Sequence, residues 1–181
     1  EFRRCIMQQL DMGASSLMQI PGFDADMVTK CNTGGCTELR QFMDMSNAER
    51  KDITGWAIDS EEMVEANEYV NHLPKVELDF DVWVDDEDEV CKGDIVTVKI
   101  VMKRTNLKED ESAGPIFTPH YPEPVFEEWW FLISVNDNPK WTLVEKARSQ
   151  DHEVTKTCYV QLSTPGTHAF TVRAVCDTYV G

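Results

Sequence analysis

The chain has 181 residues, 41% of them hydrophobic, and a formal net charge of −16. This apolar fraction is enough for a packed core. The chain contains no run of about 18 apolar residues, which a membrane-spanning helix would need. Acidic residues outnumber basic ones both in residues 1–73 and in residues 74–181, so we expect no direct binding of nucleic acid, which requires a basic patch. The balance instead permits a basic protein partner.

Residues 1–73 predict a series of short helices. Apolar spacing and capping residues mark them at about Arg4–Met12, Ser16–Ile20, Asp24–Cys31, a helix capped by Thr37, Asn47–Trp56 and a helix that Ser60 caps and Pro74 stops. Ser46 and Glu49 have the spacing of a capping box. Because none of these helices is long, tertiary packing must hold them.

One segment of this part resembles a helix-hairpin-helix. It reads Leu-Met-Gln-Ile-Pro-Gly-Phe from Leu17 to Phe23 and precedes a short helix. In that motif the Pro-Gly turn presents N–H groups at a helix start, which suits a phosphate. Asp24 and Asp26 stand where the phosphate would lie and would repel it. We therefore favour a structural turn between two packed helices.

From Pro74 onward the apolar period changes to two, which predicts strands. They are expected at about 76–84, 96–102, 127–135, 141–144, 154–162 and 168–176. Strands of this number and spacing favour an antiparallel β-sandwich. The sequence thus predicts an α+β chain with a helical domain at 1–73 and a sandwich at 74–181. A seventh strand would follow Gly181, so we expect the chain to be a piece of a larger protein with one sheet edge open.

The stretch from Glu127 to Ile133, Glu-Glu-Trp-Trp-Phe-Leu-Ile, predicts a central strand. Adjacent side chains point to opposite faces of a sheet, so one of Trp129 and Trp130 should enter the core while the other covers the second face. The stretch holds no nucleophile, metal ligand or phosphate cradle.

The six cysteines predict free thiols in a reducing compartment, because the chain is long and shows no dense cysteine spacing. An immunoglobulin-like Cys–Trp–Cys pattern through Cys91 and Cys176 is discounted, because Cys91 lies in a turn before its strand. Cys31 and Cys36 lack the further ligands that a zinc site needs. We expect no metal, no cofactor and no catalytic constellation.

Two surface segments are candidates for binding a partner. The acidic turn consists of Asp85, Asp86, Glu87, Asp88 and Glu89; it is either a solvated loop or an electrostatic contact for a basic surface. The loop over residues 105–126 is too long for a plain connection. Its Phe117, His120, Tyr121 and Phe126 either pack back on the sandwich or form an exposed apolar surface.

The order of several motifs resembles the Sec-sixty-three unit. They are the Leu17–Phe23 segment, Met-Ser-Asn-Ala-Glu-Arg at Met45–Arg50, Leu73-Pro74, Gly-Asp-Ile-Val-Thr-Val from Gly93, Pro-His-Tyr-Pro from Pro119, Glu-Glu-Trp-Trp, and Cys-Asp-Thr-Tyr-Val-Gly from Cys176. The resemblance covers nearly the whole chain. It implies a helical, partly helix-hairpin-helix region joined to a fibronectin-III-like, that is immunoglobulin-like, sandwich.

Two kinds of protein carry such a unit: the J-protein of the endoplasmic reticulum translocon and the Ski2-like RNA helicases. Three features favour the translocon branch: the acidic turn, the Pro-rich loop and the acidic pair before the tryptophans. In addition, Glu128 stands where the helicases often have glycine. The resemblance then implies a non-enzymatic module of a chaperone-linked, membrane-anchored protein. It would dock on the cytosolic face of the protein-conducting channel and its associated subunits during post-translational protein transport. The alternative is a C-terminal accessory unit of a spliceosomal RNA helicase.

Overall fold

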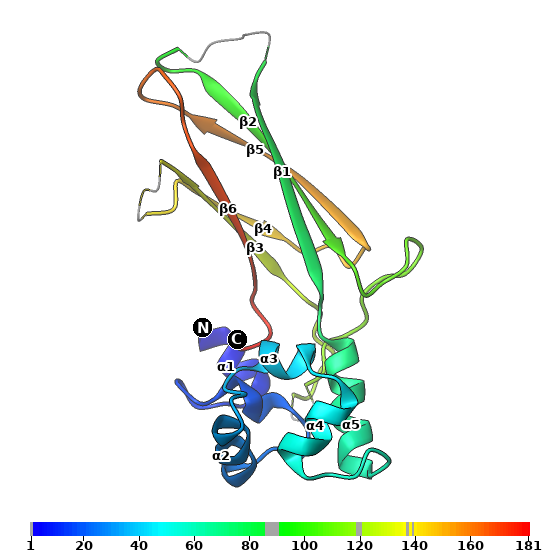
Figure 1. Cartoon of the computed structure of the whole chain (residues 1–181). Coiled ribbons are helices and arrows are strands. Elements are labelled where there is room, and N and C mark those ends of the chain that lie inside the picture. The colour runs from blue at the N-terminus through cyan, green and yellow to red at the C-terminus, as the bar shows by residue number, and fades with distance from the viewer. Residues whose placement is uncertain (1, 86–90, 119–120, 137, 139) are drawn as a thin grey trace. The chain divides into compact units, whose positions relative to one another are not determined.

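We describe a computed structural model, which defines residues 2–85, 91–118, 121–136, 138 and 140–181. Within these residues the chain forms five α-helices, one 3-10 helix and six strands (Figure 1). The helices all precede the strands in the sequence. The predicted α+β class is confirmed.

The chain divides into two compact units, neither of which is continuous in sequence. The helical unit contains residues 1–73, 115–125 and 178–181, and the strand unit contains residues 74–114 and 126–177. Part of the long loop and the last four residues therefore belong to the helical unit.

The helices of the first unit follow its capping residues. They are α1 (Phe2–Gln8), η1 (Ser16–Gln19), α2 (Ala25–Thr33), α3 (Leu39–Asp44), α4 (Asn47–Thr54) and α5 (Glu61–His72). The predicted caps at Asp24 and Ser60 are confirmed, as is the capping box of Ser46 with Glu49.

Several helix boundaries differ from the prediction: α2 runs on to Thr33 and α4 already ends at Thr54, and two further differences have a clear cause. The first helix ends at Gln8 because Gln9 takes a left-handed conformation, with φ of 51°. The N-cap of α3 is Glu38 and not Thr37, since Glu38 and Gln41 form a reciprocal capping box. A backbone conformation thus ends α1, and side-chain hydrogen bonds set the start of α3.

The strand unit contains two antiparallel sheets of three strands each, in the orders β1-β2-β5 and β4-β3-β6. The strands are β1 (Val76–Val84), β2 (Ile95–Arg104), β3 (Trp129–Val135), β4 (Leu143–Ala147), β5 (Glu153–Gln161) and β6 (Phe170–Cys176). The tryptophan strand β3 is the centre of its sheet, as predicted.

One hydrophobic core draws on both sheets. Val98 and Ile100 of β2, and Phe131 and Ile133 of β3, are fully buried in it. Trp129 is 5% exposed and joins this core, while Trp130 is half-buried on the other face of β3 under the Lys146 ammonium, 4.9 Å from the ring centroid. The predicted division of the two tryptophans between the two faces is confirmed.

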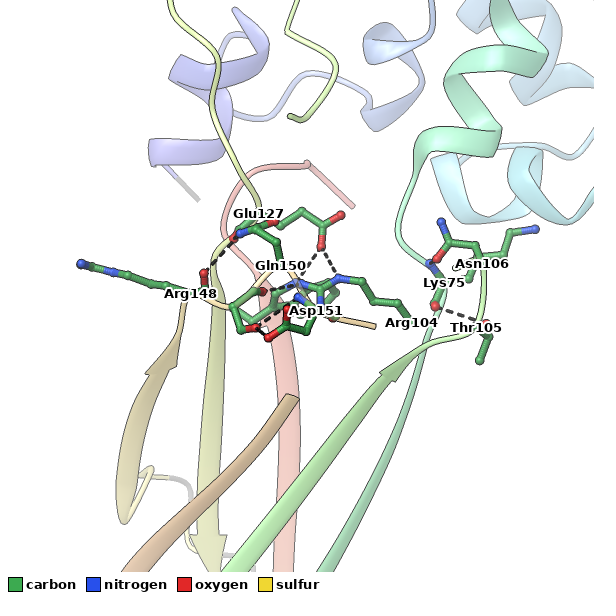
Figure 2. A network of polar contacts seen from close by, with 10 residues as sticks. Lys75, Arg104, Thr105, Asn106, Glu127, Arg148, Gln150 and Asp151 are labelled. Carbon is green, nitrogen blue, oxygen red and sulfur yellow. Dashed lines mark hydrogen bonds and ion pairs between the residues drawn. The ribbon is translucent and has the colours of Figure 1, made fainter. Parts of the chain in front are cut away.

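A buried ion pair joins the ends of three segments of the strand unit (Figure 2). Arg104, 1% exposed at the end of β2, donates from Nε to Glu127 Oε2 at 3.1 Å. Its other nitrogens donate to the carbonyl oxygens of Asp151 and Ser149. Trp129 Nε1 donates to the same Glu127 oxygen at 3.0 Å. The Arg104 guanidinium and the Glu127 carboxylate are therefore both bonded to partners within this unit.

The second member of the acidic pair, Glu128, is also occupied within the strand unit. Its carboxylate forms ion pairs with Lys146 and with Arg148, the latter at 3.0 Å. The acidic pair before the tryptophans is thus paired within the strand unit itself.

Candidate binding groove of the helical unit

A groove of about 800 Å³ is the candidate site of the helical unit. Its walls come from α1, η1, the turn after η1, α5 and the segment around Phe117. The lining residues are Met7, Gln8, Gln9, Leu10, Met18, Gln19, Ile20, Pro21, Gly22, Phe23, Glu65, Glu68, Tyr69, His72 and Phe117. Segments that lie far apart in the sequence thus form one site.

The Pro21–Gly22 turn fixes one wall of the groove. Phe23 N donates to Ile20 O at 3.1 Å across the turn, and Gly22 has φ of +76°, the value that a type II turn requires of its third residue. Phe23 packs edge-on against Phe42 and Trp56, with ring centroids 5.3 and 5.5 Å away. The turn is therefore held rigidly from behind by aromatic rings.

The start of α2, next to this turn, is already occupied by carboxylates. Asp24 Oδ1 accepts from Met27 N at 2.8 Å, and Asp26 lies in the first turn of the helix. An anion approaching these N–H groups would meet a filled cap and a second negative charge. The geometry agrees with a structural turn and offers no ready phosphate site.

The floor of the groove contains a buried tyrosine. Tyr69 is 1% exposed, and its ring packs edge-on against Phe117 at 5.2 Å and Tyr179 at 6.4 Å. Its hydroxyl is buried and has no hydrogen-bond partner among the described residues. Burial, with Tyr179 nearby, raises the pKa of Tyr69 well above its usual value, so the phenol stays neutral.

Removal of this hydroxyl should not destabilise the protein. We expect Tyr69→Phe to leave stability unchanged or to raise it by up to about 1 kcal/mol, because an unpaired buried hydroxyl costs free energy. Tyr179→Phe is the matched control, since that hydroxyl accepts from Phe117 N at 3.3 Å; it should lose about 0.5–1.5 kcal/mol. Thermal unfolding of both variants compares them, and a clear loss for Tyr69→Phe would show that its hydroxyl has a partner.

Two glutamine side chains of the groove hold the last residues of the chain. Gln19 is 7% exposed and pairs with Val180 in both directions, donating to the carbonyl at 2.6 Å and accepting from the amide at 2.8 Å. Gln8 Nε2 donates to Thr178 O at 3.1 Å and to Phe117 O at 3.4 Å. These bonds fix the tail and the loop segment to the same unit.

The rim of the groove on the α5 side is acidic. Glu65 and Glu68 are exposed there, and the ring of His72 is bonded through Nδ1 to Glu68 O at 2.9 Å. The groove thus combines an apolar floor with negative charge at its edge. Such a surface can bind an apolar segment that carries a positive charge.

The described members of the predicted partner-binding set lie in both units. Phe117 lines the groove, while Tyr121 is half-buried in the helical unit, and its N donates to Thr118 O. Phe126 is 46% exposed and belongs to the strand unit. Asp85, exposed after β1, accepts from Trp83 Nε1 at 2.7 Å. Residues 86–89 and His120 lie outside the described residues, and a role for any of these residues in binding stays a prediction.

Sequence analysis missed Tyr69, Glu65 and Glu68. All three lie on α5, whose buried residues are Met63, Ala66, Tyr69 and Val70. No signal within the helix distinguishes a tyrosine beneath a groove from a tyrosine in a core.

The remaining titratable side chains that the structure describes do not form a metal site. Among the described residues, no cluster of three or more His, Cys, Asp or Glu side chains is placed to bind a metal ion. Cys5, Cys31, Cys36, Cys91 and Cys158 are free thiols. Burial raises the pKa of Cys31 to about 11 and also raises that of Cys36. None of the helices that the structure describes is both long enough and apolar enough to cross a membrane.

The Sec63 Brl domain matches residues 4–181 of the chain. The chain is 25% identical over 181 residues to the U5 small nuclear ribonucleoprotein 200 kDa helicase of Drosophila melanogaster, and 24% identical to that of Homo sapiens. It is 26% identical over 182 residues to the pre-mRNA-splicing factor brr2 of Schizosaccharomyces pombe. Each match covers 100% of this chain and 8% of the relative.

These relatives overturn the expected translocon parent. They are helicases and splicing factors, and one from Arabidopsis thaliana is named an ATP-dependent RNA helicase. The predicted function as a J-protein in protein transport is therefore wrong. So are the predicted partners, which were translocon subunits and no nucleic acid, and the predicted location at the endoplasmic reticulum membrane. The alternative, a helicase accessory unit, is the better supported of the two.

Proposed function

Because this chain belongs to the Sec63 Brl domain family, we propose that it is a non-catalytic accessory unit of a Ski2-like RNA helicase of the spliceosomal kind. The observation that carries this proposal is the match to U5 200 kDa helicases along the whole chain at 24–25% identity. The chain spans about 8% of the length of those relatives, so the motor activity would lie elsewhere in the parent protein.

The non-catalytic role draws on the chemistry of the groove. Its lining has carboxylates, amides and one histidine, and that histidine is bonded within its own helix. A nucleophile with a general base within hydrogen-bond reach, which covalent catalysis requires, is not found among the described lining residues. The groove is suited to holding a segment of polypeptide beside the motor.

We also assign the strand unit a fibronectin-III-like sandwich. The single core shared by the two sheets supports this assignment. Among the strands that the structure describes, β6 pairs only with β3, and its core-facing Phe170 and Val172 are half-buried. A seventh strand paired with β6 would cover them.

The native transcript upstream of the codon for Glu1 tests the proposed parent. We expect it to encode a helicase motor with a Gly-Lys-Thr phosphate loop, and we expect the purified parent to hydrolyse ATP faster when RNA is present. A His-Pro-Asp J-domain preceded by membrane-spanning segments would overturn the proposal. Binding of single-stranded RNA to the isolated chain in a gel-shift assay would extend the role to RNA contact.

A further inference from the structure

The outward face of the β1-β2-β5 sheet carries three large side chains that are open to solvent. Trp83 of β1 is 40% exposed, Ile95 of β2 is 59% exposed and Tyr159 of β5 is 64% exposed. We call these three residues the aromatic face. None of them lines the groove of the helical unit, and none was singled out by the sequence.

Strand register brings the three residues together. Trp83 pairs with Thr97, and Thr97 pairs with Tyr159, so the two aromatic residues flank one threonine in a single row across the sheet. Ile95 lies two residues from Thr97 and so on the same face. Thr97 is only 4% exposed although it points outward, which indicates that its neighbours cover it. The side chains thus form one continuous apolar surface.

The rest of this outward face is mainly acidic. Glu77, Asp79 and Asp81 occupy alternating exposed positions of β1, and within the described part of the chain none of them forms an ion pair. Asp85 bonds the indole nitrogen of Trp83 at 2.7 Å. The aromatic face is therefore bordered by carboxylates at Asp81 and Asp85.

Two lysines of β2 oppose this negative charge. Lys99 lies in the row of Asp81, and Lys103 is paired with Glu153 at 3.3 Å. Counting Glu77, Asp79, Asp81, Asp85 and Glu153 against Lys99 and Lys103 gives five negative and two positive charges, a net of −3. The field around the aromatic face therefore favours a cation.

Protection of an edge strand explains only part of this pattern. Charged side chains on an edge strand such as β1 discourage pairing with another chain. That role accounts for the carboxylates but not for an exposed tryptophan and an exposed tyrosine in one row. Contiguous apolar surface rimmed by polar residues is typical of an interaction site, and tryptophan and tyrosine are enriched among residues that dominate binding energy.

We infer that the aromatic face binds an arginine- or lysine-bearing segment of a partner protein. The cation would lie over the ring of Trp83 or Tyr159, where the ring quadrupole attracts it. Asp81 and Asp85 would supply the opposite charge, and Ile95 would contact an apolar neighbour in the segment. Arginine fits best, since its planar guanidinium both stacks on rings and binds carboxylates.

A single strand of RNA is the competing occupant. Aromatic side chains on a sheet surface are platforms on which bases stack. The phosphates of such a strand would lie near Asp79, Asp81 and Asp85, and like charges repel. Charge therefore favours the basic polypeptide.

Selection of short random peptides on the immobilised chain tests the inference. We expect enrichment of arginine or lysine next to an apolar residue, and binding of the selected peptides that weakens as salt rises. In nuclear magnetic resonance spectra, the bound peptide should shift the amides of Thr97 and Tyr159. A uridine oligomer is titrated in parallel.

Variants decide whether the aromatic face is the site. Trp83→Ala and Tyr159→Ala should each weaken the selected peptides by about tenfold or more. Trp141→Ala is the matched control, because Trp141 is also 40% exposed but lies outside the aromatic face. Asp81→Asn should weaken binding less, by about threefold, and Asp59→Asn on the helical unit should have no effect. Circular dichroism confirms that each variant is folded.

Three results would overturn the inference. The first is selection without any enrichment of basic residues. The second is equal peptide binding by the chain and by Trp83→Ala. The third is binding of the uridine oligomer that Trp83→Ala abolishes, which would make the aromatic face a base-stacking platform.

Discussion

Replacement of Arg104 by methionine should lower the free energy of unfolding of the strand unit by about 3–5 kcal/mol. Methionine fills much of the volume but leaves the carboxylate of Glu127 buried without a cation. The carbonyl oxygens of Ser149 and Asp151 also lose their donor. Urea unfolding followed by tryptophan fluorescence measures the loss, since four of the five tryptophans belong to this unit and only Trp56 lies in the helical unit.

Arg148 provides the control for Arg104. It too is paired with a glutamate, at 3.0 Å, but its side chain is 73% exposed. Water replaces a lost partner at such a site, so Arg148→Met should cost no more than about 1 kcal/mol. Equal losses for the two variants would show that Arg104 is not held in a buried network.

A double variant separates lost attraction from stranded charge. In Arg104→Met combined with Glu127→Gln no buried charge remains, and the new amide oxygen still accepts from Trp129 Nε1. We expect the double variant to be more stable than Arg104→Met alone, because an uncompensated buried charge is the largest part of the penalty. A double variant less stable than the single one would contradict this account.

Local patterns in the sequence predicted most of the secondary structure. The signals are local, because each lies within a few residues of the element that it predicts. Examples are the period-two runs of β1 and β2 and the caps at Asp24, Ser46 and Ser60. Two of the misses have a clear cause: the left-handed conformation of Gln9 ends α1 early, and the capping box of Glu38 with Gln41 moves the start of α3.

Contacts between distant residues could not be predicted in this way. The pair of Arg104 and Glu127 spans 23 positions and depends on where β2 ends and β3 begins. The groove likewise needs Gln19 beside Val180, 161 positions apart. Such contacts depend on the register and packing of whole segments, about which a single sequence carries little information.

The assignment to the translocon branch failed for a related reason. Glu127 and Glu128 were interpreted as a feature of the translocon branch. The structure instead places them in ion pairs with Arg104, Lys146 and Arg148. A carboxylate that forms an ion pair within its own fold gives no information about an external partner. The acidity of the chain is subject to the same objection, because net charge reports on solubility and association but not on parentage.

Arg50 should be as important to the helical unit as Arg104 is to the strand unit. It is 6% exposed and donates from Nε to Phe42 O at 3.1 Å and from Nη2 to Met43 O at 2.9 Å, two carbonyls in the last turn of α3. Nη1 donates to Asn67 Oδ1 of α5 at 2.6 Å. One side chain of α4 therefore ties together the end of α3 and the middle of α5.

Arg50→Met should lower the stability of the helical unit by about 2–4 kcal/mol, because two carbonyl oxygens and the Asn67 amide oxygen lose their donor in buried or partly buried positions. Burial lowers the pKa of Arg50, but arginine stays charged at all ordinary pH, so the loss should not depend on pH near neutrality. Arg50→Lys should recover little of the lost stability, since an ammonium cannot reproduce the planar fork of the guanidinium.

Hydrogen exchange of the amides of α4 and α5 measures the effect within this unit. The control is Arg40→Met, because Arg40 is an exposed arginine of α3. Exchange rates that rise equally in Arg50→Met and Arg40→Met would show that the three bonds of Arg50 do not hold the helices together.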